Sequence, residues 1–264
     1  MSLRLPSPRA CILLLGTLLV ACATPVSVPP VPVLLFGEQH DQPDQQRRVA
    51  ATLADLAERG ELAALVIEMA ERGRHTEGLR RDASAAEVRA ALGWSGWDWG
   101  AYAPVVMTAV RAGVPVHGGN LPRPSMRATM SDAAFDGRVP AAAHAALLEA
   151  VRAGHCGLLP EAQAPGMVRV QVARDVSMAA TIEEAARRLR PGQRVVLLAG
   201  AQHVSKDRGV PLHLSPALAR HVVMFGLAPI GDLQADQWQP SVETPRPDPC
   251  DELRRHGLRP RAPA

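Results

Sequence analysis

Two G-x-x-H motifs and one glutamate are the residues of this sequence with the clearest chemical potential. The motifs are GEQH (residues 37–40) and GAQH (residues 200–203), and the glutamate is Glu68. Neutral imidazole and carboxylate groups suit zinc or iron, so His40, Glu68 and His203 could bind a divalent metal. Because histidine titrates near neutral pH, the same groups could instead serve as general acid and base. A third interpretation is that they only hydrogen-bond one another.

Short apolar runs next to these groups predict the strands that position them. The runs are continuous, which is typical of strands buried on both faces of a sheet. Segments with helical periodicity lie between them, and this alternation favours a mostly parallel sheet flanked by helices. We therefore predict an α/β fold with a polar site at the carboxyl ends of the strands. The predicted strands are 33–36, 64–67, 114–117, 194–199 and 222–226.

Polar side chains follow four of the predicted strands. Glu38 and His40 follow the first strand, Glu68 the second, Asn120 the third and His203 the fourth. In open parallel sheets, ligands bind beyond the carboxyl ends of the strands, so we expect these residues to share one pocket. The alternative is that Glu38, His40 and His203 are local caps and turn formers.

Two further candidate residues lie on a long predicted helix, 166–189. Arg174 and Met178 are four residues apart and therefore share a helix face. A buried arginine beside an apolar methionine suits an anionic ligand with an apolar body. The alternatives are that Met178 packs in the core and that Arg174 and Asp175 form a surface pair of little energetic value. The other predicted helices are 44–59, 74–92 in two pieces, 101–112, 123–131, 140–153 and 215–220.

The aromatic residues of the chain are few and concentrated. Trp94, Trp97, Trp99 and Tyr102 lie close together in a chain that has four Trp and one Tyr. One interpretation is a lid or platform for a flat ligand, and the other is a small local core beneath a long loop. His155, in an HCG segment at the end of a predicted helix, is a further candidate ligand.

The N-terminal residues predict export and lipidation. Arg4 and Arg9 precede an apolar run, 11–20, which is too short to span a membrane and has the length of a signal-peptide core. The run ends in Leu-Val-Ala-Cys, which resembles a lipobox, and Cys22 would carry the lipid. The alternative is a plain signal peptide cleaved close to the same position.

Composition changes along the chain predict its domain boundaries. A signal peptide covers residues 1–21, and the lipidated cysteine with a proline-rich, semi-rigid tether covers 22–32. The α/β domain covers 33–232. From 233 to 264 the chain is polar and rich in proline, so we predict a poorly ordered tail.

Charge and cysteine content narrow the function classes. The formal net charge is +3 and no basic stripe is interleaved with aromatic residues, so a nucleic-acid-binding protein is not predicted. Aromatic residues make up 3% of the chain, so the core must be aliphatic. Cys156 and Cys250 could form a disulfide in an oxidising compartment, but the sequence does not show whether they meet.

Several of these segments, taken together and in order, resemble the ChaN family of haem-binding bacterial lipoproteins in the haem-uptake, Tiki-like superfamily. The resemblance covers residues 33–227. The segments that carry it are GEQHD (37–41), IEM (67–69), WSGWDWGAYAP (94–104), GGN (118–120), HCG (155–157), VARDVSMA (172–179) and GAQHVSKDRGVPLHL (200–214).

The resemblance implies an α/β fold, an outer-membrane lipoprotein, a role in haem or iron acquisition, and a homodimer with haem between its subunits. It also implies kinship with Tiki-type metalloproteases and erythromycin esterases, in which His40, Glu68 and His203 would form the metal or acid–base set. An axial iron ligand must be His, Met, Cys or Tyr. The candidates are His40, Tyr102, His155, Met178 and His203, with His213 weaker. No C-x-x-C-H motif occurs, so covalent haem attachment is excluded.

Three functions compete at this stage. The favoured one is a non-catalytic haem-binding lipoprotein, in which Arg174 provides a cation for the propionates. The alternative is a metal-dependent or acid–base hydrolase that uses Glu38, His40, Glu68 and His203 to activate water. The third is an envelope scaffold with a vestigial pocket.

Overall fold

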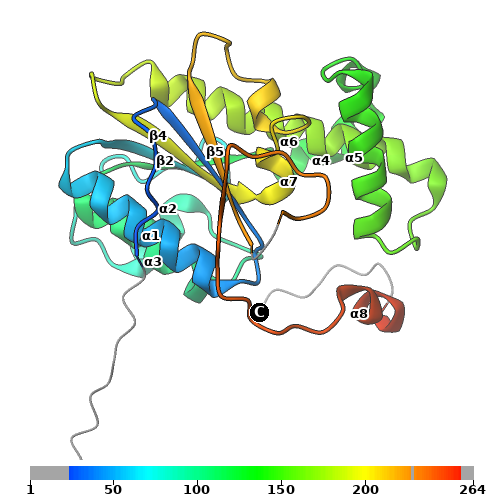
Figure 1. Cartoon of the computed structure of the whole chain (residues 1–264), viewed down its shortest axis with the longest axis horizontal. Helices are drawn as coiled ribbons and strands as arrows, with labels where there is room; N and C mark the ends of the chain where they lie inside the picture. Colours follow the sequence, from blue (N-terminus) through cyan, green and yellow to red (C-terminus); the bar gives the residue numbers. More distant parts are fainter. Residues whose placement is uncertain (1–23, 227–228, 257–264) are drawn as a thin grey trace, which may run out of the picture.

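A computed structural model describes residues 24–226 and 229–256 of the chain (Figure 1). Its centre is a six-stranded sheet in the order β3-β2-β4-β1-β5-β6. Every pair of neighbouring strands runs parallel, which confirms the predicted fold class. The strands are β1 (Val33–Glu38), β2 (Leu62–Glu71), β3 (Val116–Asn120), β4 (Arg194–Gly200), β5 (Arg220–Phe225) and β6 (Gln237–Gln239).

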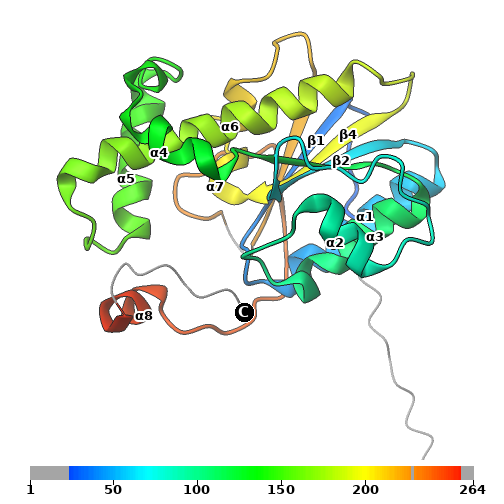
Figure 2. The ribbon, with the colours of Figure 1, turned by 180° about the vertical axis from the view of Figure 1, so that it is seen from behind.

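Helices cover both faces of this sheet (Figures 1 and 2). One face carries α1 (Pro43–Glu58), α2 (Ala85–Leu92) and α3 (Trp99–Ala112), and the other carries α6 (Ala164–Ala186) and the short α7 (Ala201–Val204). The helices α4 (Arg123–Ser131) and α5 (Ala141–Gly154) pack against α6, and α8 (Pro249–His256) lies near the C-terminus. Within the described residues, no helix combines the length and apolar character needed to cross a membrane.

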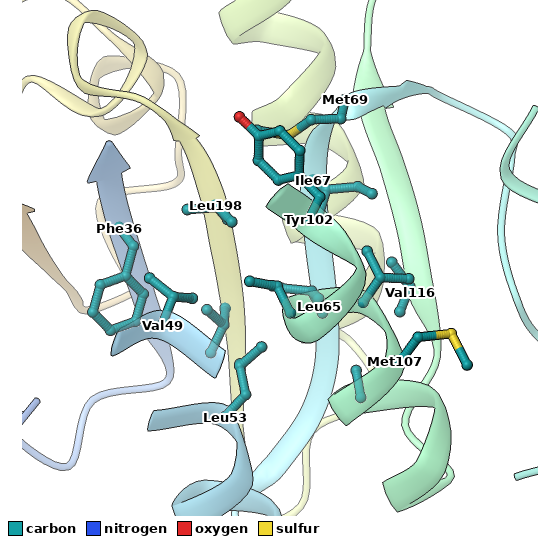
Figure 3. Packing of buried hydrophobic residues seen from close by; sticks show 14 of the residues in the cluster. Phe36, Val49, Leu53, Leu65, Ile67, Met69, Tyr102, Met107, Val116 and Leu198 are labelled. Atoms are coloured by element: carbon teal, nitrogen blue, oxygen red, sulfur yellow. The ribbon is translucent and has the colours of Figure 1, made fainter. Parts of the chain in front are cut away.

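The alternation of side chains along each strand explains the continuous apolar runs. In β1, Leu34 and Phe36 point into the cluster under α1 and α3, whereas Val33 and Leu35 point into the cluster under α6. Because helices cover both faces, neither set of side chains reaches water. Figure 3 shows the first cluster, where Phe36 lies near Val49.

A third apolar cluster lies away from the sheet and holds α5 in place. Leu147 and Val151 of α5 pack against Val168 and Val172 in the first half of α6. Figures 1 and 2 show α5 standing at one end of the molecule, beyond the sheet. Helix α5 is therefore positioned by α6 rather than by direct packing on the sheet.

The first piece of the predicted helical region 74–92 and the predicted helix 215–220 are absent from the structure, whereas the second piece of 74–92 is α2. Residues 74–84 form turns rather than a helix, because Gly73 and Gly78 adopt left-handed conformations with φ of 90° and 86°. The segment 215–219 is also a turn, and Arg220 already begins β5. The helical pattern of apolar residues is therefore overridden by glycine conformation in the first segment and by strand pairing in the second.

The segments on either side of the predicted domain are more closely bound to it than the sequence predicts. Val26, in the predicted tether, is buried at 3% exposure, and its N–H donates to the Thr52 hydroxyl. In the predicted tail, β6 pairs with β5, and Cys250 forms a disulfide with Cys156. Within residues 233–256, the predicted tail therefore contains a paired strand and a disulfide-linked helix. The predicted signal peptide and the predicted lipidation site, Cys22, lie outside the described residues.

Substitution of Gly37 tests the packing between β1 and α7. A Cβ atom at Gly37 would overlap the side chain of Val204 and lie 3.1 Å from the Cα of Ala201. We expect Gly37→Ala to lower the free energy of unfolding by about 1–3 kcal/mol, because the backbone of α7 must move. Urea unfolding measures this, with Gly137→Ala as control, since a Cβ at Gly137 meets nothing within 4 Å. Equal stability of the two variants would contradict the close approach.

Candidate functional site

The carboxyl ends of β1, β2 and β4 open into a pocket whose opposite wall is α5. The chain leaves β1 towards α1 on one face and leaves the neighbouring β4 towards α7 on the other, the position where parallel α/β sheets bind ligands. The pocket has a volume of about 560 Å³, within the usual range for small-molecule sites. Its lining includes Glu38, His40, Glu68, Trp97, Leu147, Val151, His155, Arg174, Asp175, Gly200, His203, Ile230 and Leu233.

Glu68 is the centre of the polar end of this pocket. The residue is 1% exposed, and its carboxylate forms an ion pair with Arg174 and accepts a hydrogen bond of 2.7 Å from the Gly200 N–H. The Nε2 atoms of His40 and His203 lie 3.8 and 3.7 Å from its two oxygens. Burial alone would raise the pKa of Glu68, but the charges of His203, Arg174 and His40 outweigh it and lower the pKa to about 2.

Each of these two histidines has a carboxylate behind it. His203 Nδ1 lies 2.6 Å from Asp175 Oδ1, and His40 Nδ1 lies 3.0 Å from Glu38 Oε1. A carboxylate at Nδ1 fixes the tautomer of the ring and directs Nε2 towards Glu68. Burial lowers the pKa of His40, but its hydrogen bond to Glu38 and the charge of Glu68 raise it above the usual value.

The interpretation that Arg174 and Asp175 form a surface pair is wrong, because Asp175 is buried. The Asp175 side chain is 1% exposed and pairs with His203, while Arg174 forms an ion pair with Glu68. Burial raises the pKa of Asp175 despite the opposing charge of His203. The two neighbouring residues thus belong to one buried network that extends across the pocket floor.

Tyr102 supports this network from behind. Helix α3 begins after Asp98, whose carboxylate accepts the Gly100 N–H, and its first turn places Tyr102 under the pocket. The Tyr102 hydroxyl donates to Glu38 at 2.7 Å and lies 3.0 Å from His40 Nδ1. Burial and the charge of Glu38 raise its pKa, so the hydroxyl stays protonated. Tyr102 is therefore a support for Glu38 and His40 rather than a pocket-lining ligand.

The aromatic cluster is mainly a local core. Trp94 packs edge-on against Trp99 with ring centroids 4.9 Å apart, and its indole N–H donates to the Trp97 carbonyl. Trp97 alone of the three lines the pocket, where its ring meets the His40 ring edge-on at 4.7 Å. Only this one tryptophan can contact a bound ligand, so the platform interpretation applies to Trp97 alone.

Gly200 lets the histidine of one motif approach the strand of the other. A Cβ atom at Gly200 would lie 2.9 Å from His40 Nε2 and 3.5 Å from Glu68 Oε2. Any side chain here would push the His40 ring away from Glu68. The glycine of the second G-x-x-H motif therefore makes space for the histidine of the first.

The wall opposite the polar groups is apolar and carries one histidine. Leu147 and Val151 of α5 line it together with Ile230 and Leu233. His155 follows α5, and its Nδ1 lies 2.7 Å from the Val151 carbonyl oxygen. Since a carbonyl can only accept, Nδ1 must be the donor, and the neutral ring carries its lone pair on Nε2.

Besides Tyr102, three other predicted residues do not line the pocket. Met178 is fully buried in the core between the sheet and α6, because it lies one helical turn beyond Arg174 and packs over Gly119 of β3. Asn120 lies behind the polar end, donates to the Glu68 carbonyl and accepts from Arg174. His213, the weaker candidate, follows a turn of 3-10 helix and is also absent from the lining.

The predicted metal ligands, His40, Glu68 and His203, are not arranged to bind a metal ion. In the described part of the chain, no group of three or more His, Cys, Asp or Glu side chains could hold a metal ion. The reason at His40, Glu68 and His203 is that Arg174 and the Gly200 N–H already occupy the two Glu68 oxygens. These residues form a charge network instead.

Sequence reasoning missed the deepest members of the site. Gln46 is buried and donates to Glu38, yet nothing in its helical context distinguishes it from a surface glutamine. Ile230 and Leu233 fall at the border between the predicted domain and the predicted tail. The one available signal was Asp175, which stands next to Arg174 on a helix expected to face the sheet.

The fold and the pocket define a parallel α/β protein with a ligand pocket between the sheet edge and a projecting helix. The chain belongs to the family described as haem-binding uptake, Tiki superfamily, ChaN, which matches residues 28–214. A search of curated proteins finds no match.

Three solved structures match this chain, and the first of them shows the same fold. One, described as cofacial haem binding to ChaN of Campylobacter jejuni, is 23% identical with a TM-score of 0.62, covering 78% of this chain and 86% of that one. The erythromycin esterase mutant EreC H289N in its open conformation is 14% identical with a TM-score of 0.44, covering 74% of this chain and 70% of that one. The type III effector HopBA1 is 19% identical with a TM-score of 0.42, covering 76% and 79% respectively.

Glu68→Gln tests the charge network. We expect the variant to lose roughly 3 kcal/mol of unfolding free energy at neutral pH, because Arg174 and the histidines lose their common partner. The folded pKa of Glu68 is about 2 against an ordinary value of 4.5, so its contribution is present above pH 4.5 and is lost as pH falls towards 2. Urea unfolding across this range should therefore show the gap to wild type closing.

Asp82→Asn is the matched control, because Asp82 is an exposed carboxylate paired with Arg80. Its stability should follow that of wild type throughout. A Glu68→Gln gap that stays constant down to pH 2 would contradict the lowered pKa.

Proposed function

We propose that this chain binds haem in the pocket between the sheet edge and α5. The observation that carries the proposal is a pocket with an apolar wall, a histidine nitrogen on that wall and cationic groups at the opposite end. Haem needs an apolar slot, an axial ligand and partners for two propionates. Family membership and the haem-bound relative from Campylobacter jejuni support the same ligand.

His155 is the residue that we assign as the axial ligand. Iron-ligating histidines normally donate their other ring N–H to a carbonyl or carboxylate, and His155 has this arrangement with Val151. The Nε2 atoms of His40 and His203 are instead close to Glu68, and the Tyr102 hydroxyl is hydrogen-bonded to Glu38. Among the predicted candidates, His155 thus has the least competition for its lone pair.

The polar end of the pocket would receive the propionates. Arg174 is partly exposed to the pocket, and His40, with its raised pKa, is 36% exposed there. Arg174 and His40 both already interact with Glu68. The propionates would therefore bind cations that have a carboxylate partner in the haem-free chain. We expect this end to orient haem and the apolar wall to supply most of the affinity.

The proposed wider role rests on the N-terminal sequence for export and lipidation, and on the family for the outer membrane and haem uptake. The chain would be exported, lipidated at Cys22 and held at the outer membrane, where haem or iron acquisition takes place. A homodimer is part of this proposal, because the structure from Campylobacter jejuni is described as binding haem cofacially. Stoichiometry near one haem per chain in a particle of twice the chain mass is the expected result.

A second candidate function is acid–base hydrolysis. It is favoured by the two carboxylate-backed imidazoles, whose Nε2 atoms both face Glu68. Such groups could activate water for attack on an ester or amide. A haemin titration of the wild-type chain without a Soret shift would favour this candidate.

His155→Ala tests the axial ligand. We expect haemin to produce a saturable, shifted Soret band with the wild-type chain, and the variant to bind roughly tenfold or more weakly with a different band position. His144→Ala is the control, because His144 is on the same helix but does not line the pocket. Equal affinity and identical spectra for both variants would move the ligand elsewhere.

Cys22→Ser tests the anchor. We expect the wild-type chain to sediment with membranes and to incorporate labelled palmitate, and the variant to do neither. Cys11→Ser is the matched control, because Cys11 belongs to the predicted leader and should leave with it. Membrane association of Cys22→Ser at wild-type level would contradict lipidation at this residue.

A further inference from the structure

The C-terminal segment crosses the loop that carries His40. The Gln45 amide donates to the Ser241 hydroxyl, and its carbonyl oxygen accepts from the Gln39 N–H, next to His40. Gln42 exchanges two hydrogen bonds with the Thr244 backbone, at 2.6 and 3.2 Å. We refer to residues 237–250 as the C-terminal strap.

The same strap ends on the opposite wall of the pocket. Arg246 pairs with Asp41 at 2.6 Å, and the chain then enters α8, where Cys250 forms the disulfide with Cys156. Cys156 directly follows His155. Figures 1 and 2 both show α8 below α5, with the strap passing from the sheet towards it. One segment therefore joins the His40 loop to the end of α5.

The end of α5 has little else to hold it. Val151 is the last residue of α5 in the apolar cluster with α6, and Ala153, Gly154 and Gly157 are exposed. Cys156 itself has a φ of 56°, a left-handed conformation that residues other than glycine rarely adopt. Apart from the disulfide, the turn that positions His155 is held by local hydrogen bonds, by the surface ion pair between Arg152 and Glu161, and by Leu159, which packs against the α5–α6 cluster.

The polar contacts of the strap cannot replace the covalent bond. Residues 242–249 are exposed, so the Arg246–Asp41 pair competes with water and is weak, and the two Gln42–Thr244 hydrogen bonds are only partly buried. The family match covers residues 28–214 and therefore does not include the strap or Cys250. The strap is a feature of this chain that the family assignment does not explain.

We propose that the Cys156–Cys250 disulfide positions His155, so that haem retention depends on the redox state of the compartment. This rests on the proposed haem site. A dithiol reductant would give two electrons and two protons to the disulfide, yielding the Cys156 and Cys250 thiols and an oxidised, cyclic disulfide of the reductant. The strap would then leave α5, the last turn of α5 would loosen, and haem would dissociate faster.

The test compares the oxidised wild-type chain with the double variant Cys156→Ser, Cys250→Ser. Both are loaded with haem, and transfer to excess apomyoglobin gives the dissociation rate. We expect the double variant to lose haem roughly tenfold faster, with a Soret band that reports altered ligation. Reoxidation of reduced wild-type chain should restore the slow rate.

Leu56→Ala controls for general destabilisation. Leu56 is fully buried near the end of α1 remote from the His40 loop, and its truncation lowers stability without touching the pocket. We expect its haem dissociation rate to stay at the wild-type value. A rate as fast as that of the double variant would overturn the positioning role.

Hydrogen exchange on the haem-free chain separates this proposal from the haem assignment. Reduction should speed exchange in residues 147–157 and 38–46 and leave β2 and β4 unchanged. Unchanged exchange, or equal haem dissociation rates, would overturn the proposal. If the wild-type chain binds no haem, both the proposed function and redox control of haem retention are wrong. Faster hydrogen exchange on reduction would in that case still show that the disulfide positions α5.

Discussion

The burial of the Glu68 carboxylate is the constraint on which the site depends. An ionised carboxylate in a dry interior needs opposite charge and hydrogen bonds around it, and Glu68 obtains these from Arg174, Gly200, His40 and His203. The two imidazoles need partners in turn. Asp175 and Glu38 provide them, and Tyr102 and Gln46 complete the set behind Glu38. Each member of the network is thus present because of the charge of Glu68 or of a residue that pairs with it.

The parallel sheet makes this network possible. Its strands point the same way, so three carboxyl ends deliver their polar residues to one edge. The helices that follow β1 and β4 leave on opposite faces, which opens space between the two G-x-x-H motifs. Gly200 then permits an approach between His40 and Glu68 that any other residue would block. The rigid end of the pocket is thus built from strands.

The other end of the pocket has a different construction. Its apolar wall is α5, which packs on α6 rather than on the sheet and ends in an exposed turn. The disulfide and the C-terminal strap connect this wall back to the His40 loop. A ligand in the pocket would therefore contact one surface fixed by the sheet and one whose position depends on a cross-link.

The sequence by itself determined the fold class and the location of the site. Continuous apolar runs identify strands buried on both faces, and the polar residue after each run must lie at the carboxyl edge of a parallel sheet. This local logic placed Glu38, His40, Glu68 and His203 together. It also favoured the ChaN family through several short motifs in order.

Only the tertiary structure decided which residues touch. Arg174 and Met178 share a helix face, yet one turn of helix separates the sheet edge from the core, so one lines the pocket and the other does not. Asp175 and Gln46 look like surface residues until the neighbours that bury them are known. The strap and the disulfide connect positions 94 residues apart, and such a contact depends on the folded path of the whole chain rather than on any local pattern.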